Sequence, residues 1–312
     1  MLVQAVDHVV PTLRELWREF DFLPHWRIDD VMVNASSDGA SVGPHFDYYD
    51  VFLIQGGGQK RWLTGDTCDH TTELDLAGGL KLLKQFDAKH EWLLNPGDIL
   101  YVPAGIAHHG IAIGQSMTYS LGFRAPSYAD MVMGVAEQMA EQLSDDKRYR
   151  DVSASILPHP AEIPKHVTEH LQAELLALAN NPVAIQQWFG QAMTHPRDDI
   201  TMALDNVMDT DDIESQLYNT SSAASKQALW RRPGARFAYM PDGDSLNLFA
   251  DGNTFRLSYK HLTHVQSLCD SDWSTPVPDT WIAAASQDQN LKHITLALCQ
   301  TGTLYLDEFE CN

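Results

Sequence analysis

A histidine and an aspartate two residues apart offer the first recognisable chemistry in this chain of 312 residues. They are His45 and Asp47, in the run GPHFD at 43–47. On a β-strand, residues i and i+2 point to the same face, so this imidazole and this carboxylate can face inward together. Both groups bind transition metals in proteins. An HxD pair is common by chance, however, so the prediction of a metal site needs a third ligand from elsewhere.

The segment PGDILYVPAGIAH at 96–108 supplies that ligand in His108. A Gly-Asp turn leads into a β-rich run, and a second turn at Pro103 and Gly105 leads to the histidine. Two histidines and one carboxylate form the facial triad of non-haem iron(II) oxygenases, which leaves coordination positions open for a co-substrate and dioxygen. The two segments together predict a metal site at His45, Asp47 and His108.

The other histidines give weaker signals. His109 follows His108 on the same expected strand and would point to the opposite face, so we expect it not to bind the metal. His166 and His170 are four residues apart and could share a helix face, but they lack the HExxH pattern and a third partner. A solvated helix face is the simpler interpretation of this pair.

A cation near the metal would suit a co-substrate that carries two carboxylates. Gly56–Gly58 separates two β-rich runs, which predicts a hairpin turn. If the hairpin forms, either Lys60 or Arg61 points inward beside the metal strand, and Trp62 shares the face of Lys60 and walls the pocket. The alternative for Lys60 is an exposed lysine at the start of a hairpin strand.

Three textures follow one another along the chain. Apolar residues at helical spacing up to Phe20 predict a helix within 1–30, which ends before Pro24. Short β-rich runs separated by glycines and turns then fill 31–125, the pattern of an antiparallel sandwich or barrel. These runs lie at 31–33, 50–55, 60–63, 91–94, 99–102 and 117–123.

Helices dominate the middle of the chain, and its last third mixes helices with strands. Helical segments are expected at 128–144, 166–180 and 183–193, and Asp205–Glu214 is a linker or a helix start. After that, we expect helices at 222–230, 259–267 and 289–299, and strands at 236–240, 246–249, 254–257 and 304–309. The predicted fold class is α+β, with domains at 1–127, 128–205 and 206–312.

The composition narrows the classes of function. Lys and Arg number 21 against 42 Asp and Glu, a formal net charge of -21 that disfavours contact with phosphate backbones and favours a basic partner. The charge is spread evenly, since 9 basic residues face 16 acidic ones in 1–127, 5 face 12 in 128–205, and 7 face 14 in 206–312. A soluble surface is the plainer explanation of such a spread. No apolar run is long enough for a membrane span. The four cysteines show no zinc-site spacing. Because the N-terminal sequence also lacks the features of a secretory signal, we expect reduced thiols in the cytoplasm.

At this point a family resemblance can be stated. The runs VGPHFDYYDVFLIQGGGQKRW, PGDILYVPAGIAHHG and MTYSLGFRAPS resemble the bacterial ribosomal oxygenases, which are JmjC-type hydroxylases dependent on iron(II) and 2-oxoglutarate. The resemblance implies a cupin domain with a double-stranded β-helix (jelly-roll), a helical dimerisation region and a C-terminal winged-helix-like module. It also implies a homodimer, and a substrate that is a basic protein of the large ribosomal subunit.

The family's site residues carry over one at a time. His45, Asp47 and His108 match the Fe(II) ligands, and Lys60 falls where the family places the basic residue that pairs with the far carboxylate of 2-oxoglutarate. The arginine hydroxylases resembled here typically have Arg at that place, and Lys offers a point charge where Arg offers a bidentate fork. Asn34 falls on a position that contacts 2-oxoglutarate, and Ser116 is a further candidate.

The resemblance implies hydroxylation of an arginine side chain. Family members have a substantial segment before the match to the start of this chain, so we expect the cupin part to be N-terminally incomplete. Two alternatives stay open: the same chemistry on another residue such as histidine, and a catalytically silent dimeric binding module. The C-terminal module, with its net charge of -7, is not expected to bind nucleic acid directly.

Overall fold

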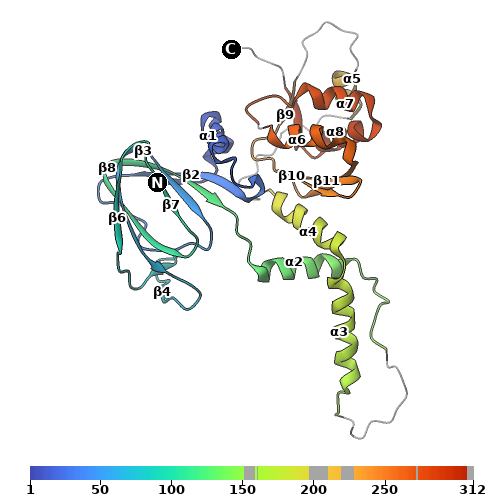
Figure 1. Cartoon of the computed structure of the whole chain (residues 1–312), viewed down its shortest axis with the longest axis horizontal. Helices are drawn as coiled ribbons and strands as arrows, with labels where there is room; N and C mark the ends of the chain where they lie inside the picture. The colour runs from blue at the N-terminus through green and yellow to red at the C-terminus, as the bar shows by residue number, and fades with distance from the viewer. Residues whose placement is uncertain (151–158, 160, 197–209, 219–227, 272, 308–312) are drawn as a thin grey trace.

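Antiparallel strands build one large sheet in the N-terminal part of the chain. The computed structural model describes residues 1–150, 159, 161–196, 210–218, 228–271 and 273–307. Within them the sheet has the order β1-β2-β8-β3-β6, with β7 also paired to β3, and it curls into the body at the left of Figure 1. Its strands are β1 (Leu2–Val3), β2 (Ile28–Ser36), β3 (Val51–Thr67), β6 (His90–Leu94), β7 (Ile99–Val102) and β8 (Ile106–Phe123).

The prediction of a hairpin turn at Gly56–Gly58 was wrong. These glycines lie inside β3, which continues through them and pairs with β8 along most of its length, with register shifts between Gln55 and Gln59. Gly58 has a φ of +61°, and a Cβ there would lie 1.8 Å from the backbone oxygen of Gln115. The irregularity changes which face the strand presents: Leu53 and Lys60, an odd number of residues apart, both line the same cavity.

The first thirty residues form shorter elements than the single helix predicted. They contain β1, the helix α1 (Pro11–Glu15) and the 3-10 turns η1 (Val6–His8), η2 (Leu16–Phe20) and η3 (His25–Arg27). The apolar spacing still marked the buried face, because Phe20 packs on the outer face of the sheet against Ile28, Val31 and Leu121. Strand β1 was missed because it forms through a distant partner, β2, which periodicity within a segment cannot reveal.

Three helices follow the sheet and confirm the predicted helical segments. They are α2 (Tyr128–Glu141), α3 (Lys165–Ala179) and α4 (Pro182–Thr194). Ser127 and Asn181 cap α2 and α4 through side-chain oxygens that accept backbone N–H bonds. Helix α2 packs on α4, where the Trp188 ring lies against Gly134 at a distance that leaves no room for a Cβ. Helix α3 has no buried residue and extends away from the rest of the chain in Figure 1.

The C-terminal part is a separate α+β unit with its own core. It contains α5 (Thr210–Tyr218), the three-stranded sheet β10-β11-β12, the pair β9-β13, and three further helices. Trp281, Leu246, Leu248 and Leu298 lie fully buried at its centre. The bounds are β9 (Ala228–Arg231), β10 (Phe237–Asp242), β11 (Ser245–Ala250), β12 (Asn253–Ser258), η4 (Tyr259–His261), α6 (Leu262–Asp270), α7 (Asp279–Gln287), α8 (Gln289–Gln300) and β13 (Leu304–Asp307).

For this unit, one expected helix was wrong, one helix was missed and one expected helix start is confirmed. The helix predicted at 222–230 was wrong where it can be compared, since Ala228–Arg231 forms strand β9, and residues 219–227 lie outside the described residues. Helix α7 was not predicted. The helix start expected in Asp205–Glu214 is confirmed by α5, although residues 205–209 also lie outside the described residues.

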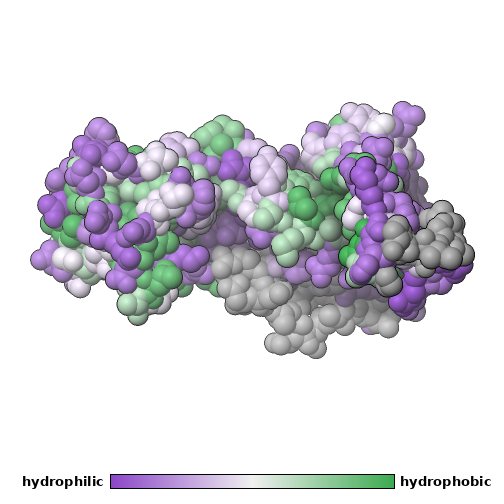
Figure 2. All heavy atoms as spheres, turned by 90° about the horizontal axis from the view of Figure 1, so that it is seen from below, coloured by the Kyte–Doolittle hydropathy of each residue, from purple (hydrophilic) through white to green (hydrophobic). Residues whose placement is uncertain are grey.

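The surface mixes apolar and polar areas. Figure 2 shows green apolar areas among purple hydrophilic ones on both the β-rich part at the left and the C-terminal part at the right. None of the described helices is both long and apolar enough to cross a membrane.

Candidate metal centre and its cavity

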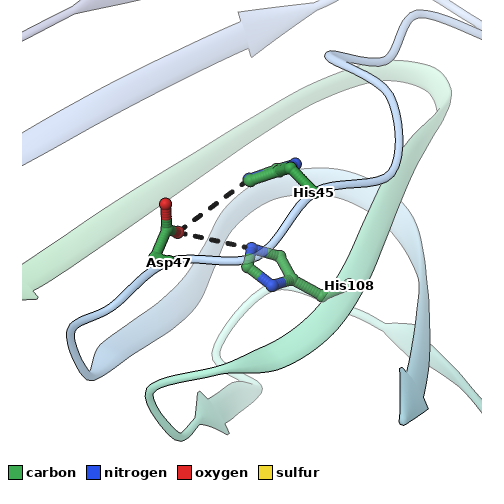
Figure 3. A group of neighbouring side chains, drawn as sticks. All are labelled: His45, Asp47 and His108. Carbon is green, nitrogen blue, oxygen red and sulfur yellow. Dashed lines mark ion pairs between the residues drawn. The ribbon is translucent and has the colours of Figure 1, made fainter. Parts of the chain in front are cut away.

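The two histidines and the aspartate singled out by their spacing lie together (Figure 3). One ligand atom from each of His45, Asp47 and His108 falls within 4.8 Å of the others. The Asp47 Oδ2 atom lies 4.0 Å from His45 Nε2 and 3.7 Å from His108 Nε2. No other such cluster of His, Cys, Asp or Glu occurs among the described residues.

The local backbone that presents His45 and Asp47 differs from the regular strand expected. Residues 44–50 form no strand, and His45 makes an isolated antiparallel bridge with His108 at the start of β8. Each backbone N–H of this bridge donates to the other residue's carbonyl, at 3.0 and 2.8 Å, and Gly105 N donates to Asp47 O. The ligands are therefore held together by pairing between two chain segments, and not by alternation along one strand.

Hydrogen bonds to the backbone orient both imidazoles. His45 Nδ1 lies 2.9 Å from Gly43 O, and His108 Nδ1 lies 2.9 Å from Ile106 O. A carbonyl can only accept, so each Nδ1 carries the hydrogen and each Nε2 keeps its lone pair. This is the tautomer that a metal-binding histidine needs, and such outer contacts commonly fix it.

The donor set fits a single divalent metal ion. Ligand atoms bound at about 2.1 Å from one ion can be about 4.2 Å apart at most, so the two distances from Asp47 are compatible with shared coordination. His108 is buried, and burial, reinforced by the neighbouring His45, lowers the pKa of His108. A lowered pKa favours the neutral imidazole that binds metal.

A cavity of about 330 Å³ opens beside the three ligands. Lys60 lines it, is only 5% exposed, and donates from Nζ to Asn34 Oδ1 at 3.2 Å. Burial lowers the pKa of Lys60 to about 8. No carboxylate among the described residues lies within ion-pair distance of this ammonium, so the cavity holds a buried cation that lacks an anion. Of the two basic residues considered, Lys60 points inward, whereas Arg61 is half-exposed near Glu91.

The structure separates the other two predicted residues. Asn34 lines the cavity and also accepts a hydrogen bond from Ser36 Oγ. Ser116 does not line it, but lies at a different hollow and accepts a hydrogen bond from Gln55 Nε2 at 3.0 Å. Trp62 forms part of the wall, as expected, with Lys60 Nζ 4.9 Å from the centre of its ring.

Several polar residues of the cavity were not found from the sequence. Asp29, Asp30, Tyr49, Ser120 and Arg124 all line it. Burial, followed by the nearby Asp47 carboxylate, raises the pKa of Tyr49. These residues stand on β2, after Asp47 and at the end of β8, and only the curled sheet brings them together. A polar residue inside an apolar strand was the one available signal, at Asp30 and Ser120.

Two family models match the chain. A JmjC domain matches residues 15–131, and a ROXA-like winged helix matches residues 175–274. The first covers the three candidate metal ligands and all of the cavity lining except Leu2 and Gln4. The second begins within α3 and ends just after α6, so it overlaps both of the regions predicted at 128–205 and 206–312.

Relatives with known structures extend the match over almost the whole chain. The X-ray structure of E. coli YcfD has a TM-score of 0.80 and 30% identity, over 98% of this chain and 78% of that one. The chain belongs to the bacterial ribosomal oxygenase family. The ribosomal protein uL16 3-hydroxylase of Escherichia coli (strain K12) is 37% identical over 209 residues, which are 65% of this chain. The chain thus matches about half of that curated relative's length, 54%.

Membership of this family confirms the predicted fold class. The β-rich part is a JmjC domain of cupin type, and a winged helix follows the helical region. A further structure of E. coli YcfD, in complex with cobalt and 2-oxoglutarate, matches this ribosomal oxygenase chain with a TM-score of 0.75 and 31% identity, over 98% of this chain and 78% of that one.

Proposed function

We propose that this chain is an iron(II)- and 2-oxoglutarate-dependent hydroxylase that acts on an arginine of a basic protein of the large ribosomal subunit. One observation carries the proposal: a His-Asp-His cluster and a buried lysine without an anion line the same cavity. The relatives support it, since one is named a ribosomal protein hydroxylase and another was solved with cobalt and 2-oxoglutarate.

His45, Asp47 and His108 would hold the metal, and Lys60 would hold the far carboxylate of 2-oxoglutarate. When bound, iron(II) lets dioxygen oxidise 2-oxoglutarate to succinate and carbon dioxide and places the second oxygen atom in a C–H bond of the substrate. The chain's own part is to bind and orient. The backbone bonds to His45 and His108 keep both Nε2 atoms available, and Asn34 orients the Lys60 ammonium.

The charge of the cavity supports a cationic side chain as substrate. Asp30 and Asp29 line the cavity with carboxylates, although Asp29 already pairs with Arg124, and the Tyr49 ring offers a surface on which a guanidinium can stack. The net charge of -21 favours encounter with a basic ribosomal protein. A histidine substrate would need the same carboxylates less, because imidazole is largely neutral at pH 7.

Turnover with a defined substrate tests the proposal. The protein is incubated with iron(II), 2-oxoglutarate and a purified large-subunit ribosomal protein, and peptides are mapped by tandem mass spectrometry. We expect one added oxygen on an arginine and succinate in equal amount, both lost in His108→Ala and kept in His109→Ala. Oxygen on a histidine would correct the substrate residue, and the absence of both products would leave the silent binding module.

Exposed apolar side chains on two helices, α3 and α2, support a homodimer. Leu171, Leu175 and Leu176 on α3 are each more than half exposed, as are Val132 and Met133 on α2. A group of exposed apolar side chains on a helix often marks a protein–protein interface, so we expect two copies of the chain to associate through these helices. Sedimentation should give a dimer for the wild type and for the control Gln172→Glu, and a monomer for Leu175→Glu. A monomeric wild type at micromolar concentration would end this proposal.

A ribosomal substrate implies a cytoplasmic protein, which completes the proposal. The expectation that the C-terminal module does not bind nucleic acid stays a prediction.

A further inference from the structure

Arg236 joins the C-terminal module to the catalytic part. It stands just before β10, and its guanidinium donates to three backbone carbonyls at and just before the start of β2. The acceptors are Ile28 O at 2.7 Å, Asp29 O at 3.3 Å and Trp26 O at 3.4 Å. The side chain is 13% exposed, so these bonds form in a largely dry junction.

The carbonyls are available because β2 is irregular at this point. Ile28 pairs with Phe123 and Val31 with Leu121, so Asp29 and Asp30 form a bulge in the pairing of β2 with β8. A bulge leaves backbone groups without their ladder partners, and buried carbonyls need other donors. Arg236 provides those donors from a different domain.

The same bulge faces the cavity of the metal centre. Asp29 Oδ1 accepts from Arg124 Nε at 2.8 Å and lies 4.0 Å from Arg236 Nη1. Asp29 and Arg124 both line the cavity. Met193 O, near the end of α4, accepts from both guanidiniums, at 3.4 Å from Arg124 and 3.3 Å from Arg236. The catalytic part, the helical region and the module therefore meet around one cluster of charges.

The cluster continues toward the metal ligands. Arg27 Nε donates to Arg124 O at 3.2 Å, and Arg27 Nη2 pairs with Asp50 Oδ2 at 2.8 Å. The other Asp50 oxygen accepts from Tyr101 Oη at 2.8 Å. Asp50 lies three residues after Asp47 in the chain. The charged cluster therefore reaches from the C-terminal module to the backbone next to a proposed metal ligand.

Within the C-terminal module, Asp251 holds the backbone of Arg236 in place. Its Oδ1 accepts from the backbone N–H of Arg236 at 2.8 Å, and its Oδ2 pairs with Arg232 Nη2 at 2.8 Å. Arg232 is also buried, but the hydrogen bonds of its guanidinium go to Asp251 and Pro233, within the module. Of these two arginines, therefore, only Arg236 forms hydrogen bonds with the N-terminal JmjC part of the chain.

We propose that Arg236 is a positioning residue that holds the β2 bulge and, through Asp29 and Arg124, the cavity wall that meets the protein substrate. The module would thereby take part in substrate placement without touching the metal ligands. This inference rests on the proposed hydroxylase function, because the cavity wall matters only if a substrate enters it.

Arg236→Gln and its matched control Arg232→Gln test the inference in the full-length protein. We expect Arg236→Gln to lower kcat/KM for the ribosomal protein at least tenfold, while the dissociation constant of 2-oxoglutarate changes less than twofold. Arg232→Gln should change both values less than twofold, even if it lowers the melting temperature as much as Arg236→Gln does. Arg236→Lys should recover part of the loss, because one ammonium can replace some of the three backbone bonds. Equal losses in the two Gln variants, or no loss in Arg236→Gln, would overturn the inference.

Hydrogen exchange gives a readout that does not depend on turnover. Amides of 26–36 should exchange at least tenfold faster in Arg236→Gln than in Arg232→Gln if Arg236 holds the bulge. Equal exchange in the two variants would overturn the inference. A wild type without hydroxylation, but with this difference in exchange, would instead remove the hydroxylase function and leave the structural role of Arg236 in place.

Discussion

Replacing Lys60 by Met should stabilise the ligand-free protein and weaken 2-oxoglutarate binding at the same time. Burial lowers the pKa of Lys60 from 10.5 to about 8. Each unit corresponds to about 1.4 kcal/mol, so keeping this ammonium charged in the fold costs about 3 kcal/mol at pH 7. Met has a similar length and no charge, and Asn34 Oδ1 would still accept from Ser36. The free energy of unfolding at pH 7 should therefore rise by up to about 3 kcal/mol.

The pH dependence gives the sign of the effect independently. The pKa of Lys60 is lower in the folded state than in the unfolded chain, so between about pH 8 and 10.5 the unfolded chain binds more protons. The contribution of Lys60 to stability therefore rises with pH across this window, and below pH 8 the full penalty is present. Urea titrations of wild type and Lys60→Met at pH 7 and pH 10 measure the difference, which should shrink at the higher pH.

Ligand binding should move in the opposite direction. Removing the charge partner of a buried carboxylate costs about 2 kcal/mol or more, so the dissociation constant of 2-oxoglutarate should rise at least about 30-fold in Lys60→Met. In the wild type, affinity should fall as pH rises above about 8, because only the ammonium form binds the anion. The control Arg61→Met removes a half-exposed surface charge and should change neither stability nor affinity appreciably. A Lys60→Met protein that is less stable than wild type at pH 7, with unchanged affinity, would refute this reasoning.

Two further substitutions test packing. Gly110→Ala would place a Cβ 2.7 Å from the Trp62 ring and 2.9 Å from Lys60 Cε. We therefore expect the free energy of unfolding, measured by urea titration, to fall by about 1–3 kcal/mol and 2-oxoglutarate binding to weaken. In the control Gly57→Ala the nearest atom would lie 3.8 Å from the new Cβ, so neither quantity should change. Trp281→Ala removes a fully buried ring whose Nε1 donates to Thr295 Oγ1 at 3.0 Å, and it should cost about 3–5 kcal/mol of the module's stability; a loss below about 1 kcal/mol would contradict the core described here.

The His-Asp-His cluster could be predicted from the sequence, but the way in which its residues are held together could not. His45, Asp47 and His108 were found because metal binding restricts residue types and because a turn motif precedes His108. Strand alternation predicted that His45 and Asp47 lie together, and they do, but the local reason was wrong, since a bridge between two segments holds them. Such a bridge depends on tertiary pairing, which spacing along one segment does not encode.

The errors in the fold have similar causes. Three glycines between β-rich runs are typical of a turn, but they also suit a strand that bulges where the Gln115 backbone approaches closely, and this is their role in β3. Trp230 was assigned to a helix and lies in β9, whose partner β13 is distant in sequence. The polar cavity residues on β2 and β8, and the reach of Arg236 across domains, follow only from the assembled fold.

All of the proposed chemistry depends on one claim, that His45, Asp47 and His108 bind a single metal ion. Calorimetric titration of the metal-free protein with cobalt(II) tests it directly. We expect one ion per chain for the wild type and for His109→Ala, and at least tenfold weaker binding for His45→Ala and for His108→Ala. Equal affinity in all four proteins, or no binding by the wild type, would contradict the account.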